Sequence, residues 1–178
     1  MAREHDEDFV AFAAAALPRL RRTAYLVCGD WHRADDAAQE ALIKLYAVWP
    51  RVERREGVMA YSRRTLIRVL VDHTRRPWRH EVSHAETPEP APADVDADAR
   101  VAEQLVLMQA LRRVSPRRRA CLVLRYFNDL SVAETAVVMG SSQGTVKSQT
   151  VKGLQELRAA LELVGGTGIE LWEEVRIR

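Results

Sequence analysis

The segment DLSVAETAVVMGSSQGTVKSQTVKGLQEL, residues 129–157, constrains the fold of this chain more than any other stretch. Ser131, with Glu134 three positions later, forms a capping box, which opens a helix by satisfying two backbone donors. Gly140 supplies the permissive backbone of a sharp turn, and Ser141 or Ser142 starts a second helix as its N-cap. The pattern predicts two short helices joined by a tight turn, a helix-turn-helix.

The second of these helices has an apolar side, formed by Val146, Leu154 and Leu157, and a polar, cationic side. Amide, hydroxyl and ammonium groups on such a side suit base edges and phosphates. The candidate residues are Gln143, Thr145, Lys147, Ser148, Gln149 and Lys152. An ordinary helical hairpin with a solvated face is the alternative, because a lone capping box is common. The surrounding sequence must decide between the two.

Length and composition favour a small helical protein. The chain has 178 residues, of which 47% are apolar, enough for one or two small domains with a core each. Leu, Ala, Arg, Glu and Val dominate, Gly is scarce, and the alternation typical of strands is almost absent. We therefore predict an all-α fold.

The formal net charge of +2 hides a segregation of charge along the chain. Residues 51–80 hold nine Arg and no Lys against three acids, a net charge of +6. Residues 81–103 hold seven acids against one Arg, a net charge of −6. Adjacent blocks of opposite sign favour a module that binds a polyanion, followed by an acidic linker. Arginine without lysine favours bidentate phosphate contacts over a merely solvated face.

Chemistry-bearing residues give no enzymatic pattern. Cys28 and Cys121 lie in apolar surroundings without a CxxC motif, so we expect reduced core thiols and no metal site. We find no phosphate-binding Gly loop and no nucleophile–base arrangement, and we expect neither a cofactor nor catalysis. The first residues lack a signal-peptide layout, and the longest apolar run, residues 9–17, cannot span a bilayer. A cytoplasmic protein without membrane insertion is expected.

Proline and glycine divide the chain into two helical halves. In the first half we expect helices at 7–16, 18–29, 34–49 and 58–75. Residues 81–100 contain three prolines and almost no large apolar side chains, which predicts a flexible acidic linker. Helical periodicity resumes at Val101, breaks at Ser115-Pro116 and leads into the helix-turn-helix. We expect two small helical domains on a tether.

The helix expected at 34–49 has two faces. Leu42, Leu45, Tyr46 and Trp49 recur at helical spacing and predict a buried stripe. A second face carries Asp36, Gln39, Glu40 and Lys44. Acids near the start of a helix also complement its dipole, so capping is the alternative explanation for Asp35 and Asp36. The order of parts favours a binding role: an acidic amphipathic helix, an Arg-rich helix, an acidic linker and a helix-turn-helix.

In that order the chain resembles a bacterial RNA polymerase sigma factor of the extracytoplasmic-function (ECF) class, in the sigma-70 family. DDAAQEALIKLYAVWPRV is similar to the family's core-polymerase-binding helix, and YSRRTLIRVLVDH (residues 61–73) to its promoter −10 helix. LSVAETAVVMGSSQGTVKSQTVKGLQELR resembles its −35 reader. The SQGTVKSQTVKGL run and the Arg- and Trp-rich first half look most like an actinobacterial, SigE-like subgroup.

The resemblance implies a division of the chain and a set of partners. Residues 1–80 would form sigma region 2, 81–100 the linker, 101–164 sigma region 4 and 165–178 a C-terminal tail. The implied partners are the β and β′ subunits of core RNA polymerase and promoter DNA, duplex at −35 and single-stranded at −10. An anti-sigma factor is a further candidate partner.

The resemblance also assigns candidate residues. Those implied for core binding are Asp36, Gln39, Glu40 and Lys44. Those implied for −10 DNA are Arg51, Tyr61, Arg63, Arg64, Arg68, His73, Arg75, Arg76 and Trp78, with the loop Pro50–Gly57 as the wall of a base pocket. Arg117–Arg119 would lie near the DNA backbone at −35, so Arg117 and Arg118 join the six recognition-helix candidates named above.

Two other classes of protein remain open. A repressor or activator with one helix-turn-helix would explain the second half and would bind duplex DNA without polymerase. An anti-sigma or adaptor protein would bind polymerase without a DNA-binding face. The last 14 residues, GGTGIELWEEVRIR, carry enough apolar side chains to dock on a domain, although a disordered end is the alternative. Deleting residues 165–178 without change in stability or transcription would refute that docking.

Overall fold

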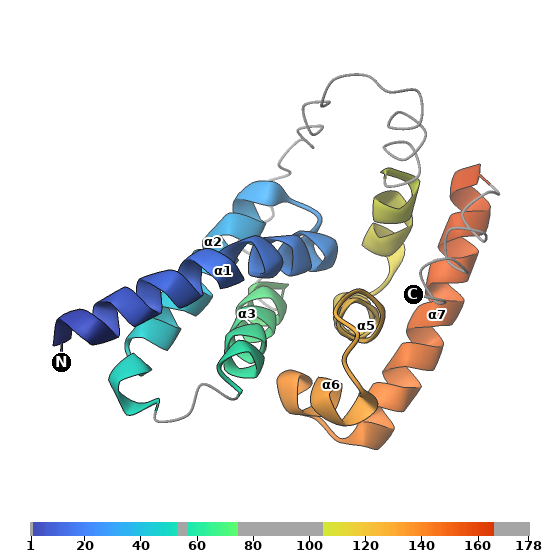
Figure 1. The fold of residues 1–178 in the computed structure, drawn as a ribbon. Coiled ribbons are helices and arrows are strands. Elements are labelled where there is room, and N and C mark those ends of the chain that lie inside the picture. Colours follow the sequence, from blue (N-terminus) through green and yellow to red (C-terminus); the bar gives the residue numbers. More distant parts are fainter. Residues whose placement is uncertain (1, 53–56, 75–104, 166–178) are drawn as a thin grey trace.

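The computed structural model describes residues 2–52, 57–74 and 105–165, and they form two helical domains side by side (Figure 1). The first domain contains α1 (Ala2–Cys28), α2 (Trp31–Tyr46), the short 3-10 helix η1 (Trp49–Arg51) and α3 (Val58–Thr74). The described residues contain no strand, so the predicted all-α class is confirmed. The segments expected to form the acidic linker and the tail lie outside the described residues, except for the helical residue Gly165.

Helix α1 is continuous, so the two helices expected at 7–16 and 18–29 were wrong. Pro18 lies inside the helix on its exposed side. It leaves the Ala14 carbonyl without its helical N–H donor, a loss that solvent can offset at an exposed position. The preceding run of alanines has the highest helix propensity. One continuous helix also places Ala16, Leu20 and Ala24 in the same core, each at most 1% exposed.

Helix α2 begins and ends three residues earlier than expected. Its N-cap is Asp30, whose Oδ1 accepts a hydrogen bond from Arg33 N at 2.9 Å, so Asp35 and Asp36 do not cap it. Trp49 belongs to η1 and is buried against the rings of Phe9 and Phe12.

The stripe predicted on α2 is confirmed at Leu42, Leu45 and Trp49 but was wrong at Tyr46. The Tyr46 side chain is 49% exposed, and its hydroxyl donates to Asp6 Oδ1 at 3.0 Å. Its ring packs against Phe9 with centroids 4.9 Å apart. Tyrosine can lie at the edge of a core in this way because only its ring is apolar.

The second domain contains helical residues 105–113, α5 (Pro116–Leu122), α6 (Val132–Met139) and α7 (Gln143–Gly165). A π-helical turn, η3 (Val123–Phe127), continues α5. The predicted break is confirmed, since Ser115 is the N-cap of α5 and Pro116 its first residue. Leu111, Leu122 and Leu157 are buried in this domain's own core, each at most 1% exposed.

Gly153 allows α5 and α7 to cross closely, a role that the sequence analysis missed. A Cβ atom at this position would lie 3.2 Å from Arg118 Cβ and 3.2 Å from Leu122 Cγ. Leu122 is fully buried and cannot move aside easily. The helix that carries the recognition face is therefore fixed against the body of its domain by a glycine.

Both cysteines are free thiols, as predicted. Cys121 is buried, and burial raises its pKa to about 11. Burial likewise raises the pKa of Cys28, which lies at the end of α1. In the described part of the chain, no helix has the length and apolar character needed to cross a bilayer.

Candidate polymerase and promoter interfaces

The helix-turn-helix predicted from the capping box is confirmed in α6 and α7. Glu134 N donates to Ser131 Oγ at 3.1 Å, and Ser131 N donates to Glu134 Oε2 at 2.7 Å. Hydrogen bonds from Ser131 lower the pKa of the Glu134 carboxyl. Gly140 ends α6 with φ 58°, in the left-handed region that favours glycine. The capping box and the left-handed backbone at Gly140 fix the direction in which α7 leaves the turn.

Helix α7 starts at a serine cap and anchors itself by one buried valine. Thr145 N donates to Ser142 Oγ at 3.1 Å, so Ser142, one of the two predicted caps, is the one used. Val146 is 1% exposed and faces the domain core. The side chains on either side of it consequently point away from the domain.

The recognition face predicted on α7 lies at the surface. Gln143, Lys147 and Lys152 are exposed, and Gln149 is half-buried. The Ser148 hydroxyl donates to Thr145 O at 3.0 Å, which leaves its oxygen as an acceptor. At Gly144 an added Cβ would meet nothing closer than Ser142 Oγ at 3.9 Å, so the backbone here is open to approach. The face combines amides, hydroxyls and ammonium groups within about three helical turns.

The three arginines of α5 have different surroundings. Arg117 is exposed. Arg118 is half-buried and forms an ion pair with Glu156 of α7. Arg119, which the sequence analysis placed near the DNA backbone, is buried, and its guanidinium donates to backbone carbonyls that include Val114 O and Val27 O. Burial lowers the pKa of Arg119 to about 10.

The face of α2 predicted to bind polymerase is a polar surface with an apolar margin. Asp36 and Gln39 are exposed, and Lys44 Nζ donates to Glu40 Oε1 at 2.6 Å. Ile43 is 69% exposed beside them, an exposure that the sequence analysis missed. The face therefore combines polar and charged groups with one exposed aliphatic side chain at its edge.

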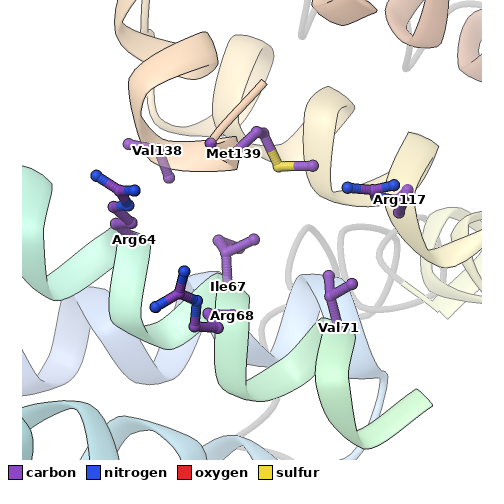
Figure 2. Close-up of a pocket in the computed structure, with 8 residues that line it drawn as sticks. Arg64, Ile67, Arg68, Val71, Arg117, Val138 and Met139 are labelled. Carbon is purple, nitrogen blue, oxygen red and sulfur yellow. The ribbon is translucent and has the colours of Figure 1, made fainter. Parts of the chain in front are cut away.

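The −10 candidates in α3 are divided between two sides of the helix. Arg64 and Arg68 line one cleft with Val138 and Met139 of α6, and Figure 2 shows Arg64 directed toward α6. Arg63 is half-buried in a separate cleft with Arg19 and Asn128, and burial lowers its pKa. The His73 side chain, Arg75, Arg76 and Trp78 lie outside the described residues. The structure thus brings Arg64 and Arg68 together and separates Arg63 from them.

A cavity of about 270 Å³ opens beside the loop predicted to form a base pocket. Arg51 and Tyr61, both predicted −10 residues, lie at its border, and Tyr61 is 42% exposed. Its other described walls are Leu45, Val48, Val52, Gly57 and Val58. A mostly apolar hollow with an aromatic ring and a guanidinium at its edge has the chemistry needed to receive a flat, unstacked base.

The fold and these surfaces define a two-domain, helix-turn-helix DNA-binding protein. Residues 12–80 match Sigma-70 region 2, and residues 104–157 match Sigma-70, region 4. An RNA polymerase sigma-E factor of Streptomyces coelicolor is 33% identical over 154 residues, which cover 86% of this chain and 86% of that protein. The ECF RNA polymerase sigma factor SigM of Mycobacterium tuberculosis is 27% identical over 153 residues, covering 86% and 76%.

A solved structure supports the same fold. The sigma factor RpoE of Bartonella quintana, in complex with the anti-sigma factor NepR, matches with a TM-score of 0.67 over 88% of this chain and 98% of that one, at 22% identity. The chain belongs to the sigma-70 family and is an RNA polymerase sigma factor of the ECF class.

Proposed function

We propose that this sigma factor binds RNA polymerase core through the α2 face and positions it at promoters with two separate DNA contacts. Region 2 takes the −10 strand at α3 and the adjacent cavity, and region 4 reads the −35 duplex with α7. The observation that carries the proposal is that one chain holds three surfaces together. They are the helix-turn-helix of α6 and α7, the exposed polar face of α2, and the cavity at Tyr61 that suits a base. The proposed limits are 1–80 for region 2 and 101–164 for region 4.

The contact with polymerase uses Asp36, Gln39, Glu40 and Lys44 of α2. We assign the β and β′ subunits as the partners of this face, and Ile43 as an apolar anchor at its margin. Charged and amide groups at such an interface set specificity and association rate. Ile43 adds apolar area that the polar groups alone lack.

The −10 contact must compensate for unstacking a base, which costs a few kcal/mol. Stacking on an aromatic ring returns about 1–3 kcal/mol per base, and Tyr61 lies at the cavity mouth with its ring partly in solvent. Arg51, Arg64 and Arg68 are exposed cations near the same helix and suit the DNA backbone. Arg63, His73, Arg75, Arg76 and Trp78 complete the proposed −10 set.

The −35 contact is assigned to α7. Lys147, Lys152 and Arg117 are exposed and serve as phosphate contacts. The base-edge candidates are Gln143, Thr145, Ser148 and Gln149. Arg118 is a weaker candidate, because it must leave Glu156 to reach a phosphate.

A regulator that binds duplex DNA without polymerase is not favoured, because it leaves both the α2 face and the cavity without a use. We place the protein in the cytoplasm, where polymerase and promoters are found, and we assign it no catalytic role. An anti-sigma factor is a further proposed partner.

Run-off transcription tests the function directly. Purified bacterial core polymerase is incubated with and without this protein on a pool of genomic promoter fragments. We expect promoter-specific transcripts only with the protein, and their start sites give the −35 and −10 sequences. A shifted duplex without transcripts and without core binding would instead support the helix-turn-helix regulator.

A further inference from the structure

A cleft of about 430 Å³ lies between α1, α3 and the end of η3, and we call it the α1–η3 cleft. It shares no wall residue with the cavity at Tyr61 or with the cleft of Figure 2. Its described walls carry three guanidinium groups, two apolar side chains, a hydroxyl, an amide and one carboxylate. Small-molecule sites in proteins have volumes of roughly 300–1,000 Å³, so the α1–η3 cleft has the size of a ligand site.

The three guanidinium groups come from two helices. Arg19 and Arg22 are three positions apart on α1, so their side chains share one face of that helix, and both are exposed. Arg63 comes from α3 and is half-buried. Burial lowers the pKa of Arg63, and the positive charge of Arg19 lowers it further. Like charges are thus held close together where water screens them incompletely.

No carboxylate neutralises these three cleft arginines by direct contact. The adjacent Arg21 pairs with Asp35, but within the described part of the chain no ion pair includes a cleft arginine. Glu134 acts on Arg63 through its charge, while its carboxylate is bonded to Ser131 N. The α1–η3 cleft therefore carries positive charge that a bound anion would balance.

Phosphate is the anion that such a group of arginines suits. A guanidinium is planar and binds two phosphate oxygens at once, through parallel hydrogen bonds. Because each guanidinium presents several N–H donors, three of them suit two linked phosphate groups better than a single one.

The remaining walls match the other parts of a nucleotide. Phe127 and Leu26 supply a flat ring and an aliphatic surface against which a base can lie. The amide of Asn128, whose Oδ1 accepts from Thr23 Oγ1 at 3.1 Å, follows that ring in the wall. Asp129 is exposed and contributes the carboxylate, a group that accepts hydrogen bonds from ribose hydroxyls in dinucleotide sites.

We propose that the α1–η3 cleft binds a nucleotide with two or more phosphate groups. The cleft arginines hold the phosphates, Asp129 accepts from the ribose, and the base lies against Phe127. This site needs neither polymerase nor promoter DNA, and Arg63 is the residue that it shares with the proposed −10 set. Absence of nucleotide binding would consequently leave the sigma-factor function standing, and absence of run-off transcripts would leave the nucleotide site standing.

Isothermal titration calorimetry of the full chain with ADP, in buffer without divalent cations, tests the site. We expect wild type to bind one ADP per chain. Arg22→Ala is expected to weaken binding about tenfold, the effect of losing one charged hydrogen bond. Arg33→Ala removes an equal charge from an exposed position of α2 outside the cleft and should bind ADP as wild type does. No ADP binding by wild type, or equal weakening in both variants, would overturn the proposal.

A second variant changes the charge of the wall without removing an arginine. Asn128→Asp keeps an acceptor for the Thr23 hydroxyl and adds a negative charge. We expect it to weaken ADP and pyrophosphate alike, by at least about tenfold, through repulsion of the phosphates. Far-UV circular dichroism and thermal unfolding verify that the variant is folded. Unchanged affinities in a folded Asn128→Asp chain would place the anion elsewhere and overturn the proposal.

Comparison with pyrophosphate separates a nucleotide site from a general anion site. We expect ADP to bind wild type about tenfold more tightly than pyrophosphate, and Phe127→Leu to remove most of that difference. Asp129→Asn, which suits the φ of 51° at this position, should tighten pyrophosphate more than ADP, because the ribose loses its charged acceptor. Equal affinities of wild type for ADP and pyrophosphate would overturn the assignment to a nucleotide.

DNA is the other source of phosphate in the surroundings of such a protein. A short labelled duplex is therefore titrated into wild type, Arg22→Ala and Arg33→Ala. We expect Arg22→Ala to lose affinity for ADP and to bind the duplex as Arg33→Ala does. If Arg22→Ala lost affinity for the duplex alone, the α1–η3 cleft would serve the DNA backbone and the proposal would be wrong.

Discussion

Arg118 of α5 and Glu156 of α7 form an ion pair that joins the recognition helix to the body of its domain. Glu156 Oε2 also accepts a hydrogen bond from Ser115 N at 3.2 Å, at the start of α5. One carboxylate thus holds both the N-cap residue of α5 and a cation of its first turn. Because the face of α7 reads DNA in the proposed function, this pair determines how that face is presented.

Glu156→Gln should lower the free energy of unfolding by about 1 kcal/mol, since it weakens a half-buried charged hydrogen bond and a helix-start contact. Urea denaturation followed by circular dichroism measures the change. Glu162→Gln is the matched control on the same helix, because its partner Arg158 lies 3.5 Å away and both side chains are mostly exposed. Equal effects of the two substitutions would contradict a special role for Glu156.

Ser131→Ala should destabilise the helix-turn-helix by about 1 kcal/mol, the usual loss for a removed N-cap. The pH dependence of Glu134 provides an independent test. Its pKa is lowered in the folded state, so its stabilising contribution is present above the ordinary carboxyl pKa and is lost as pH falls through the lowered value. The stability difference between wild type and Glu134→Gln should therefore shrink in mild acid. A stability difference between the two proteins that stays constant with pH would argue against a stabilising Ser131–Glu134 capping box.

Two glycines of α7 should respond oppositely to the same substitution. The methyl group added by Gly144→Ala lies in open space. This substitution should therefore stabilise the free protein by roughly 0.5 kcal/mol, because alanine has the higher helix propensity. Gly153→Ala places a methyl group 3.2 Å from Leu122 Cγ and should destabilise it. Thermal unfolding compares them. Weaker −35 binding by the stabilised Gly144→Ala variant would show that DNA approaches the backbone there.

Local signals in the sequence predicted the local structure well. The Ser131–Glu134 pair opens α6 through hydrogen bonds between side chains and backbone N–H groups three residues apart, and Gly140 ends it. Both signals are local, so they could be recognised in the sequence without knowledge of the tertiary fold. Pro18 was misleading because proline usually marks the first turn of a helix. What overrode this preference was packing of both halves of α1 against the same core, which no local pattern shows.

The contacts between domains could not be predicted. Arg119 stands in the run Arg117–Arg119, where composition alone suggests three similar surface cations. Only the position of the α1 C-terminus, 92 residues earlier in the sequence, makes Arg119 a buried donor to Val27 O. The cavity beside Tyr61 likewise depends on tertiary packing. Its walls come from the end of α2, from η1 and from the start of α3, which only the fold brings together.

The two proposed interfaces can be separated by matched substitutions of exposed residues. Lys147→Ala removes one phosphate contact, so it should weaken binding to a −35 duplex, reduce the slope of log affinity against log salt by about 1, and lower initiation only at promoters that depend on −35. Asp36→Ala combined with Gln39→Ala should instead weaken core binding at every promoter, because these residues lie on α2, away from the recognition helix.

Fluorescence anisotropy with core polymerase and with duplex DNA, measured on the same preparations, distinguishes these outcomes. Each variant serves as the control for the other, since both remove side chains that are exposed in the free protein. If Lys147→Ala reduced core affinity while leaving DNA affinity unchanged, the assignment of α7 to −35 DNA would be wrong. If the Asp36 and Gln39 variant bound core normally, the polymerase contact would have to lie elsewhere on region 2, with the exposed Ile43 margin as the next surface to alter.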